Sequence, residues 1–230
     1  MIDEPGIRLR ARQFMAQLDL SNIRTDLSVY AKKVNAKLDT EELAEGESGY
    51  TLVNRSGKAS IVVNELENLE RQRFSICHEV AHLVLDLASD HKAVPPWSYA
   101  KRDPNEIACD IFASELLMPF EQFKRDVDQE EPSFDLIDRL RKEYVVSFSA
   151  CGSRLASVTD YPCAFVFMDS QVVRYAARSK ALRDLNAWIE MGAPIPNGSV
   201  AKELIESESS FGEDLCIEQD VWFRDWPKVS

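Results

Sequence analysis

The stretch that decides the fold runs from Arg73 to Asp86 and reads RFSICHEVAHLVLD. Its apolar residues recur at the spacing of one helical face, which predicts an amphipathic helix. His78 and His82 are four residues apart, so they lie one turn apart on the same face. Two imidazoles placed in this way can occupy two corners of a tetrahedral zinc site. Glu79 is turned by about 100° from His78, so it can act as a general base beside the metal without binding it.

The pattern His-Glu-x-x-His fixes three positions, and chance produces it in on the order of one chain in a hundred of this length. The alternative is a helix whose two histidines lie on the surface or are hydrogen-bonded for structural reasons. The chain has only three histidines, and two of them fall in this motif. The motif therefore predicts a metal site on this helix.

A catalytic zinc site needs a third protein ligand and an open position. A third histidine after a glycine bend is excluded, because Leu85 and Ala88 occupy the positions where that arrangement requires Gly and His. Downstream, Glu106 and Asp110 are four residues apart and share a face of a second predicted helix. This spacing suits a carboxylate ligand and a carboxylate that accepts the proton of a ligating histidine.

The spacing alone leaves Glu106 open between two roles. Asp103 at the N-cap, Pro104 at the first helical position and Glu106 three residues after the cap also fit a capping box. Glu115 is a rival ligand on the same helix. Cys109 reads as a small apolar filler, with a redox-sensitive thiol as the alternative.

Two motifs together resemble the ImmA/IrrE family of metallopeptidases. The first is Arg-Phe, three residues and then His-Glu-x-x-His, from Arg73 to His82; the second runs from Glu106 through Phe-Ala and Leu-Leu-Met-Pro to Pro119. The resemblance covers roughly residues 20–157 and implies a zincin-like peptidase with Glu106 as the third ligand. The chain departs from the family pattern at three positions, where Ala108 replaces Glu, Cys109 replaces Ala and Asp110 replaces the common Asn. None of these changes removes a ligand.

The remaining patterns predict an α+β fold, in which a small sheet packs on the helix that carries the motif. Ser21 is a plausible N-cap for the second of the predicted helices, and the strand at 59–64 is a candidate edge strand along which a peptide substrate could pair. Arg8, Arg10 and Arg12 are expected on a solvated helix face. The predicted helices cover 7–18, 21–34, 133–159 with one break, 181–189 and 200–206, and the predicted strands cover 36–43, 49–54, 59–64, 164–168 and 171–175.

We expect three parts: a zincin-like metallopeptidase core at 1–125, a helical, helix-turn-helix-like segment at 126–159 and a small α+β module at 160–230. An aromatic-rich end containing Trp222 and Trp226 is expected to be buried against the hairpin at 164–175. The net charge of −12 and the acidic surroundings of 133–157 disfavour direct binding of nucleic acid. The helical segment is therefore expected to serve packing or partner recognition.

Composition restricts the cellular setting. No apolar run reaches membrane-spanning length, and the N-terminus lacks the pattern of a signal peptide, so no membrane association is expected. Five cysteines without a Cys-x-x-Cys pair favour free thiols in a reducing cytoplasm.

The function predicted from these observations is that of a zinc-dependent endopeptidase. His78, His82 and Glu106 bind Zn²⁺, with Mn²⁺ as the alternative metal, Glu79 is the general base and Asp110 orients a histidine. His91, Tyr99 and Arg102 are candidates for the group that stabilises the oxyanion. The resemblance implies a substrate: a helix-turn-helix repressor encoded nearby, cut to derepress phage, mobile-element or stress genes. The alternative is a non-cleaving regulatory binding module, or a toxin–antitoxin component, with a structural or vestigial metal.

Overall fold

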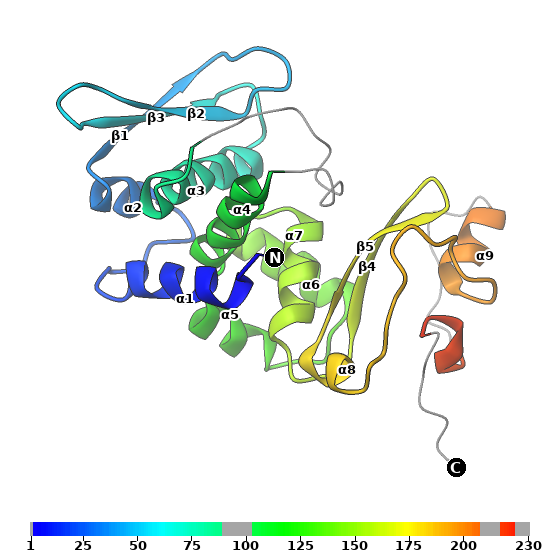
Figure 1. Ribbon diagram of the computed structural model, residues 1–230. Helices are drawn as coiled ribbons and strands as arrows, with labels where there is room; N and C mark the ends of the chain where they lie inside the picture. Colours follow the sequence, from blue (N-terminus) through cyan, green and yellow to red (C-terminus); the bar gives the residue numbers. More distant parts are fainter. Residues whose placement is uncertain (1, 89–102, 208–216, 224–230) are drawn as a thin grey trace. The chain divides into compact units, whose positions relative to one another are not determined.

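Helix α3 (Leu69–Leu85) carries the motif and packs against a three-stranded sheet and against helix α4 (Pro104–Leu117) (Figure 1). The structure is a computed structural model that describes residues 2–88, 103–207 and 217–223. The sheet comprises β1 (Ala36–Glu41), β2 (Gly49–Val53) and β3 (Ala59–Asn64). The fold is α+β, as the sequence predicted.

The order of the strands is β1-β3-β2, with β1 parallel and β2 antiparallel to β3. Strand β3 is buried at almost every position, because it has a neighbour on each side and α3 packs on it. The expectation that residues 59–64 form an edge strand is therefore wrong. Strand β2, which also contacts α3, is the edge strand beside the motif helix.

The remaining elements agree in most places with the predicted ones. The turn joining β2 to β3 contains Gly57 at φ 78°, as its Ser-Gly pair predicted. The helical segment has one break at 145–147, where Val145 takes φ 51°. The other elements are α1 (Glu4–Met15), α2 (Ser28–Lys33), α5 (Phe120–Val127), α6 (Phe134–Tyr144), α7 (Phe148–Val158), β4 (Ala164–Asp169), β5 (Val172–Arg178), α8 (Lys180–Asp184), α9 (Val200–Glu206) and the 3-10 turn η2 (Gln219–Val221).

The second predicted helix is much shorter than its apolar stripe. The backbone amides of Thr25 and Asp26 both donate to the Asn22 carbonyl, and the Asp26 carboxylate accepts from the Ser28 amide at 2.7 Å. These local bonds form turns in place of the first helical turns. Ser21 is therefore not the N-cap, and only Ser28–Lys33 is helical.

Two of the three arginines of α1, Arg8 and Arg12, form ion pairs inside the molecule, whereas Arg10 is exposed as expected. Arg8 and Arg12 reach the Glu115 carboxylate of α4 at 3.3 and 2.9 Å, and Glu115 is fully buried. Arg10 donates to the carbonyl of Val84 at the end of α3. These bonds fasten α1 to both helices that carry the motifs.

The chain forms two compact units. Unit 1 comprises 1–123 and 138–151, and unit 2 comprises 124–137 and 152–230. The expected three-part division of the chain stays a prediction. Unit 2 contains the antiparallel hairpin of β4 and β5. Helix α8 ends at Asp184, because Leu185 is its C-cap and Asn186 takes φ 54°, so the helix predicted to reach residue 189 is shorter.

Two further expectations concern parts that the structure describes only partly. Cys77, Cys109, Cys151 and Cys163 are free thiols within the described ranges. Trp222 is half-buried, whereas Trp226 lies outside the described residues. In the part of the chain that the structure describes, no helix combines the length and apolar character needed to cross a membrane.

Candidate metal centre

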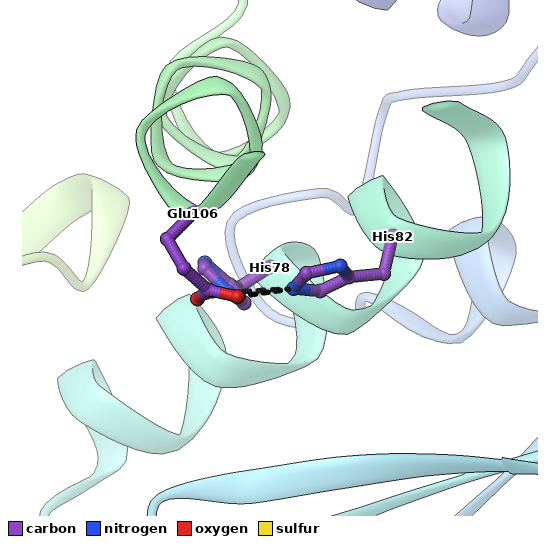
Figure 2. Close-up of side chains that lie close together, drawn as sticks. All are labelled: His78, His82 and Glu106. Atoms are coloured by element: carbon purple, nitrogen blue, oxygen red, sulfur yellow. Dashed lines mark hydrogen bonds and ion pairs between the residues drawn. The ribbon is translucent and has the colours of Figure 1, made fainter. Parts of the chain in front are cut away.

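Helix α3 presents both histidines of the motif toward α4. The helix begins after Asn68, whose side chain accepts from the Arg71 amide, and it runs without interruption to Leu85. His78 and His82 are both buried. Figure 2 shows their rings on the same side of the helix, facing the carboxylate of Glu106.

Helix α4 supplies the third side chain. Asp103 caps this helix by accepting from the Asn105 amide at 2.7 Å. Glu106 stands in the first turn, and its carboxylate faces the two histidines of α3. The cap and the site thus use different residues, because Asp103 provides the first and Glu106 contributes to the second.

The three side chains meet at the spacing that a tetrahedral metal requires. His78 Nε2 lies 3.1 Å from Glu106 Oε2 and 3.1 Å from His82 Nε2, and His82 Nε2 lies 3.5 Å from Glu106 Oε1. Ligands at 2.0–2.1 Å from a tetrahedral ion are about 3.3 Å apart. Among the described residues, this is the group that could hold a metal ion. Two nitrogens and one carboxylate oxygen also form a donor set that suits zinc.

The opposite edge of each imidazole is held in place. His78 Nδ1 is 3.0 Å from Asp110 Oδ1, and His82 Nδ1 is 3.1 Å from the Leu87 carbonyl. A carbonyl only accepts, so His82 must carry its proton on Nδ1 in this bond. The Leu87 carbonyl comes within reach because Asp86 ends the helix at φ 55°. With both Nδ1 atoms engaged, the Nε2 lone pairs remain for a metal.

The two histidines have opposite electrostatic environments. Burial by itself would lower the pKa of His78, but hydrogen bonds with Asp110 and Glu106 raise that pKa to about 9. Burial, and next the charge of His78, lower the pKa of His82. In the absence of a metal, the site therefore holds a proton on His78. A metal ligand must be a neutral imidazole, so a cation would replace that proton.

Glu79 is buried next to the group, with 1% of its surface exposed. The Thr51 hydroxyl of β2 donates to Glu79 Oε2 at 2.7 Å. The neighbouring cysteines, Cys77 and Cys109, are fully buried, and burial raises the pKa of Cys77 to about 12. Burial also raises the pKa of Cys109, which fits an apolar filler better than a reactive thiol.

The rival ligand does not belong to this group. Glu115 is engaged by Arg8 and Arg12 and does not contribute to the cluster. The oxyanion candidates His91, Tyr99 and Arg102 lie outside the described residues. Sequence reasoning missed Thr51 and the Leu87 carbonyl. Strand alternation could have pointed to Thr51, but a backbone carbonyl leaves no mark in a sequence.

Comparison with known proteins assigns the chain to a family. The model of the peptidase family M78, described as the IrrE N-terminal-like domain, matches residues 31–156. A search of curated proteins finds no significant match. A solved structure, a Mycobacterium tuberculosis transcriptional regulator, superposes with a TM-score of 0.53 at 15% identity, over 76% of this chain and 56% of that one.

This likeness to a solved structure concerns the fold alone, and the chain spans little more than half of that protein's length. The range that the family model matches, in contrast, covers the positions of all five predicted site residues. The family model also matches more than half of the sequence. The chain belongs to the ImmA/IrrE family, peptidase family M78.

Proposed function

We propose that this protein is a zinc-dependent endopeptidase. The observation that carries the proposal is the convergence of His78, His82 and Glu106 within 4.8 Å of one another, with the buried Glu79 carboxylate adjacent in sequence to the first ligand. In this proposal the three converging side chains bind the metal. Glu79 acts as the general base, and Asp110 orients His78. Mn²⁺ is the alternative cation, because the carboxylate of Glu106 is a ligand type that also suits it.

When bound, the cation would act as a Lewis acid toward water and the scissile carbonyl. The Glu79 carboxylate accepts the proton of the attacking water and then delivers it to the amine that leaves. Asp110 holds His78 Nδ1, so the ring keeps its Nε2 directed at the cation. Burial of Glu79 and the three ligands strengthens these electrostatic interactions.

The substrate would be an extended peptide that pairs with β2. This strand is an edge of the sheet, and its side chains Leu52 and Val53 are each 59% exposed. Main-chain hydrogen bonds to a strand edge bind a peptide independently of its sequence. Exposed side chains such as Leu52 and Val53 would then determine which peptide sequences are preferred. The central position of β3 leaves that role to β2.

The protein substrate we propose is a helix-turn-helix repressor encoded nearby. The family resemblance supports this choice, and the solved neighbour is itself named a transcriptional regulator. The four described free thiols suit a reducing compartment, and we place the reaction in the cytoplasm. Cleavage of such a repressor would release the genes that it silences.

The test incubates the purified, zinc-loaded protein with the repressor product of the adjacent gene. We expect cleavage at one place, loss of cleavage with a chelator, and restoration when zinc is added back. Glu79→Gln should retain zinc and lose cleavage by about 10³-fold or more, because it removes the base but leaves the ligands. An intact repressor in every lane would contradict the proposal. Stable binding without cutting would favour the non-cleaving regulatory module.

A further inference from the structure

Thr51 is a hydroxyl of the edge strand that reaches the motif helix. Successive side chains of a strand point to opposite faces, so Thr51 points away from the face of Tyr50 and Leu52. The Tyr50 hydroxyl accordingly lies near Glu41 of β1, at 3.4 Å, whereas Thr51 Oγ1 donates to Glu79 Oε2. At 2.7 Å the Thr51 bond has the length of a charge-assisted hydrogen bond to a carboxylate.

We propose that Thr51 is a positioning residue for Glu79. Its hydroxyl fixes Oε2 and thereby the plane of the carboxylate that takes the proton of the attacking water. This inference rests on the proposed function and adds to it. The family motif contains Glu79 itself, whereas Thr51 lies 28 residues earlier on a different element.

The close packing of β2 against β3 explains how a hydroxyl on an edge strand can hold Glu79 in place. Gly49 lies opposite Val63 in the register of the two strands. A Cβ at position 49 would lie 2.8 Å from the Val62 carbonyl, so only glycine permits this approach of β2 to β3. The close approach fixes β2 on the sheet and Thr51 with it. A peptide pairing with β2 would then share one strand with the group that orients the base.

A purely structural role for the same bond is the competing explanation. A buried carboxylate without a donor costs free energy, so the hydroxyl could serve only to satisfy Glu79. The two roles differ in what they change. A structural role changes the stability of the fold, whereas a positioning role lowers kcat and leaves KM and metal content unchanged.

The experiment compares Thr51→Val, Thr51→Ser and Thr40→Val in the zinc-loaded protein. Thr40 is the matched control, because it is an exposed threonine on β1, at the other edge of the sheet. We expect Thr51→Val to lower kcat by about 10–100-fold at unchanged KM, because misplaced catalytic groups cost about this much. Thr51→Ser should restore kcat to within about threefold of wild type, since it keeps the hydroxyl. Thr40→Val should behave as wild type.

A second readout does not depend on cleavage. A peptide hydroxamate gives a proton to the carboxylate beside the metal, so its affinity also reports the orientation of Glu79. We expect Thr51→Val to weaken hydroxamate binding by about tenfold while zinc stoichiometry stays at that of wild type.

The outcomes separate this inference from the proposed function. Wild-type kcat and hydroxamate affinity in Thr51→Val would overturn the role of Thr51, whereas the peptidase assignment would stand. A wild-type protein that cuts nothing would overturn the peptidase assignment, and the hydroxamate measurement would then decide on Thr51. Loss of thermal stability in Thr51→Val, at unchanged kcat and hydroxamate affinity, would establish the structural role. A zinc-loaded wild type that neither cuts nor binds the hydroxamate would overturn both.

Discussion

Both compact units bury polar side chains, and a comparison between them shows two different reasons for such burial. In unit 1 the buried side chains of His78, His82 and Glu106 converge on one point. In unit 2 the buried hydroxyls serve the backbone: Ser179 and Ser199 cap α8 and α9 by accepting amides in the first turn of each helix. Burial of a polar group by itself therefore does not indicate a functional site. The convergence of several buried metal-binding side chains from two helices is what makes His78, His82 and Glu106 a candidate site.

The same contrast exists between two carboxylates of α4. Glu106 and Glu115 are both buried, but Glu106 faces imidazoles, whereas Glu115 faces the arginines of α1. One carboxylate therefore completes the group that could hold a metal ion, and the other forms an internal ion pair. Replacing one carboxylate of each kind should therefore affect metal affinity and stability to different extents.

We expect the largest effect from Glu106→Ala. Removing a ligand should weaken zinc binding by more than about 100-fold, because the outer contacts of a metal site alone are worth about 10–100-fold. The metal-free protein should also lose some stability near neutral pH, because Glu106 is one of the carboxylates that hold His78 in its charged form. Competition with a chromogenic chelator measures the affinity. Wild-type zinc affinity in this variant would contradict the assignment of the third ligand.

Glu115→Ala should lower stability and leave metal binding intact. Glu115 accepts charge-assisted hydrogen bonds from Arg8 and Arg12, whose side chains are partly exposed, so we expect its removal to cost about 2 kcal/mol in the free energy of unfolding. Zinc affinity should remain that of wild type. Urea unfolding of the metal-free variant measures the loss. A stable variant with impaired zinc binding would show that the two carboxylates do not divide the roles in this way.

Asp110→Asn tests the contact behind His78. The amide keeps the size of the side chain but removes the charge that favours the ligating ring. We expect zinc affinity to fall by about 10–100-fold, less than for Glu106→Ala. The same titration measures it, and an affinity equal to that of wild type would remove Asp110 from the metal centre.

The pKa of His78 sets the pH dependence of metal binding. This pKa is raised from 6.5 to about 9 in the metal-free protein, so its stabilising contribution is complete below about pH 6.5 and is lost as pH rises through about 9. Zinc must displace the proton, so apparent affinity should rise about tenfold per pH unit between pH 7 and 9. Calorimetry in buffers of different ionisation enthalpy measures the released proton. Absence of proton release at pH 7.5 would contradict a protonated His78.

Ser179→Ala should have the smallest effect and act on unit 2. Ser179 Oγ accepts from the amides of Cys163 and Leu182, at 3.2 and 3.3 Å. Losing a cap of this kind costs about 1 kcal/mol, and we expect that loss with unchanged zinc affinity. Hydrogen exchange of the amides in α8 shows whether this loss of stability is confined to that helix. A change in zinc binding would show that the cap also supports the metal centre.

Local sequence patterns correctly predicted the parts of the fold that depend on residues adjacent in the chain. The period of the motif gave α3, and the Asp103-Pro104 pair gave the start of α4. The apolar stripe from Ile23 to Val34 predicted burial correctly, since Ile23, Leu27 and Tyr30 are buried, but the helix that it predicted from Ser21 begins only at Ser28. Side-chain and backbone bonds at Asn22 and Asp26 form turns there.

The sequence did not predict which strands pair or which distant side chains form ion pairs. Nothing in residues 59–64 indicates that β1 pairs on one side and β2 on the other, so the edge strand was assigned to the wrong segment. Arg8 and Arg12 of α1 were misread for the same reason, because their partner Glu115 lies more than 100 residues away in the sequence. The sequence could predict that His78 and His82 lie together, because both belong to one motif within a single helix.

Anomalous scattering at the zinc edge, from crystals grown with zinc, tests the central claim most directly. We expect one peak about 2.0–2.2 Å from His78 Nε2, His82 Nε2 and an oxygen of Glu106, with a fourth position open to solvent. A peak bound by other side chains, or a Glu106 carboxylate turned away from the two rings, would contradict the account.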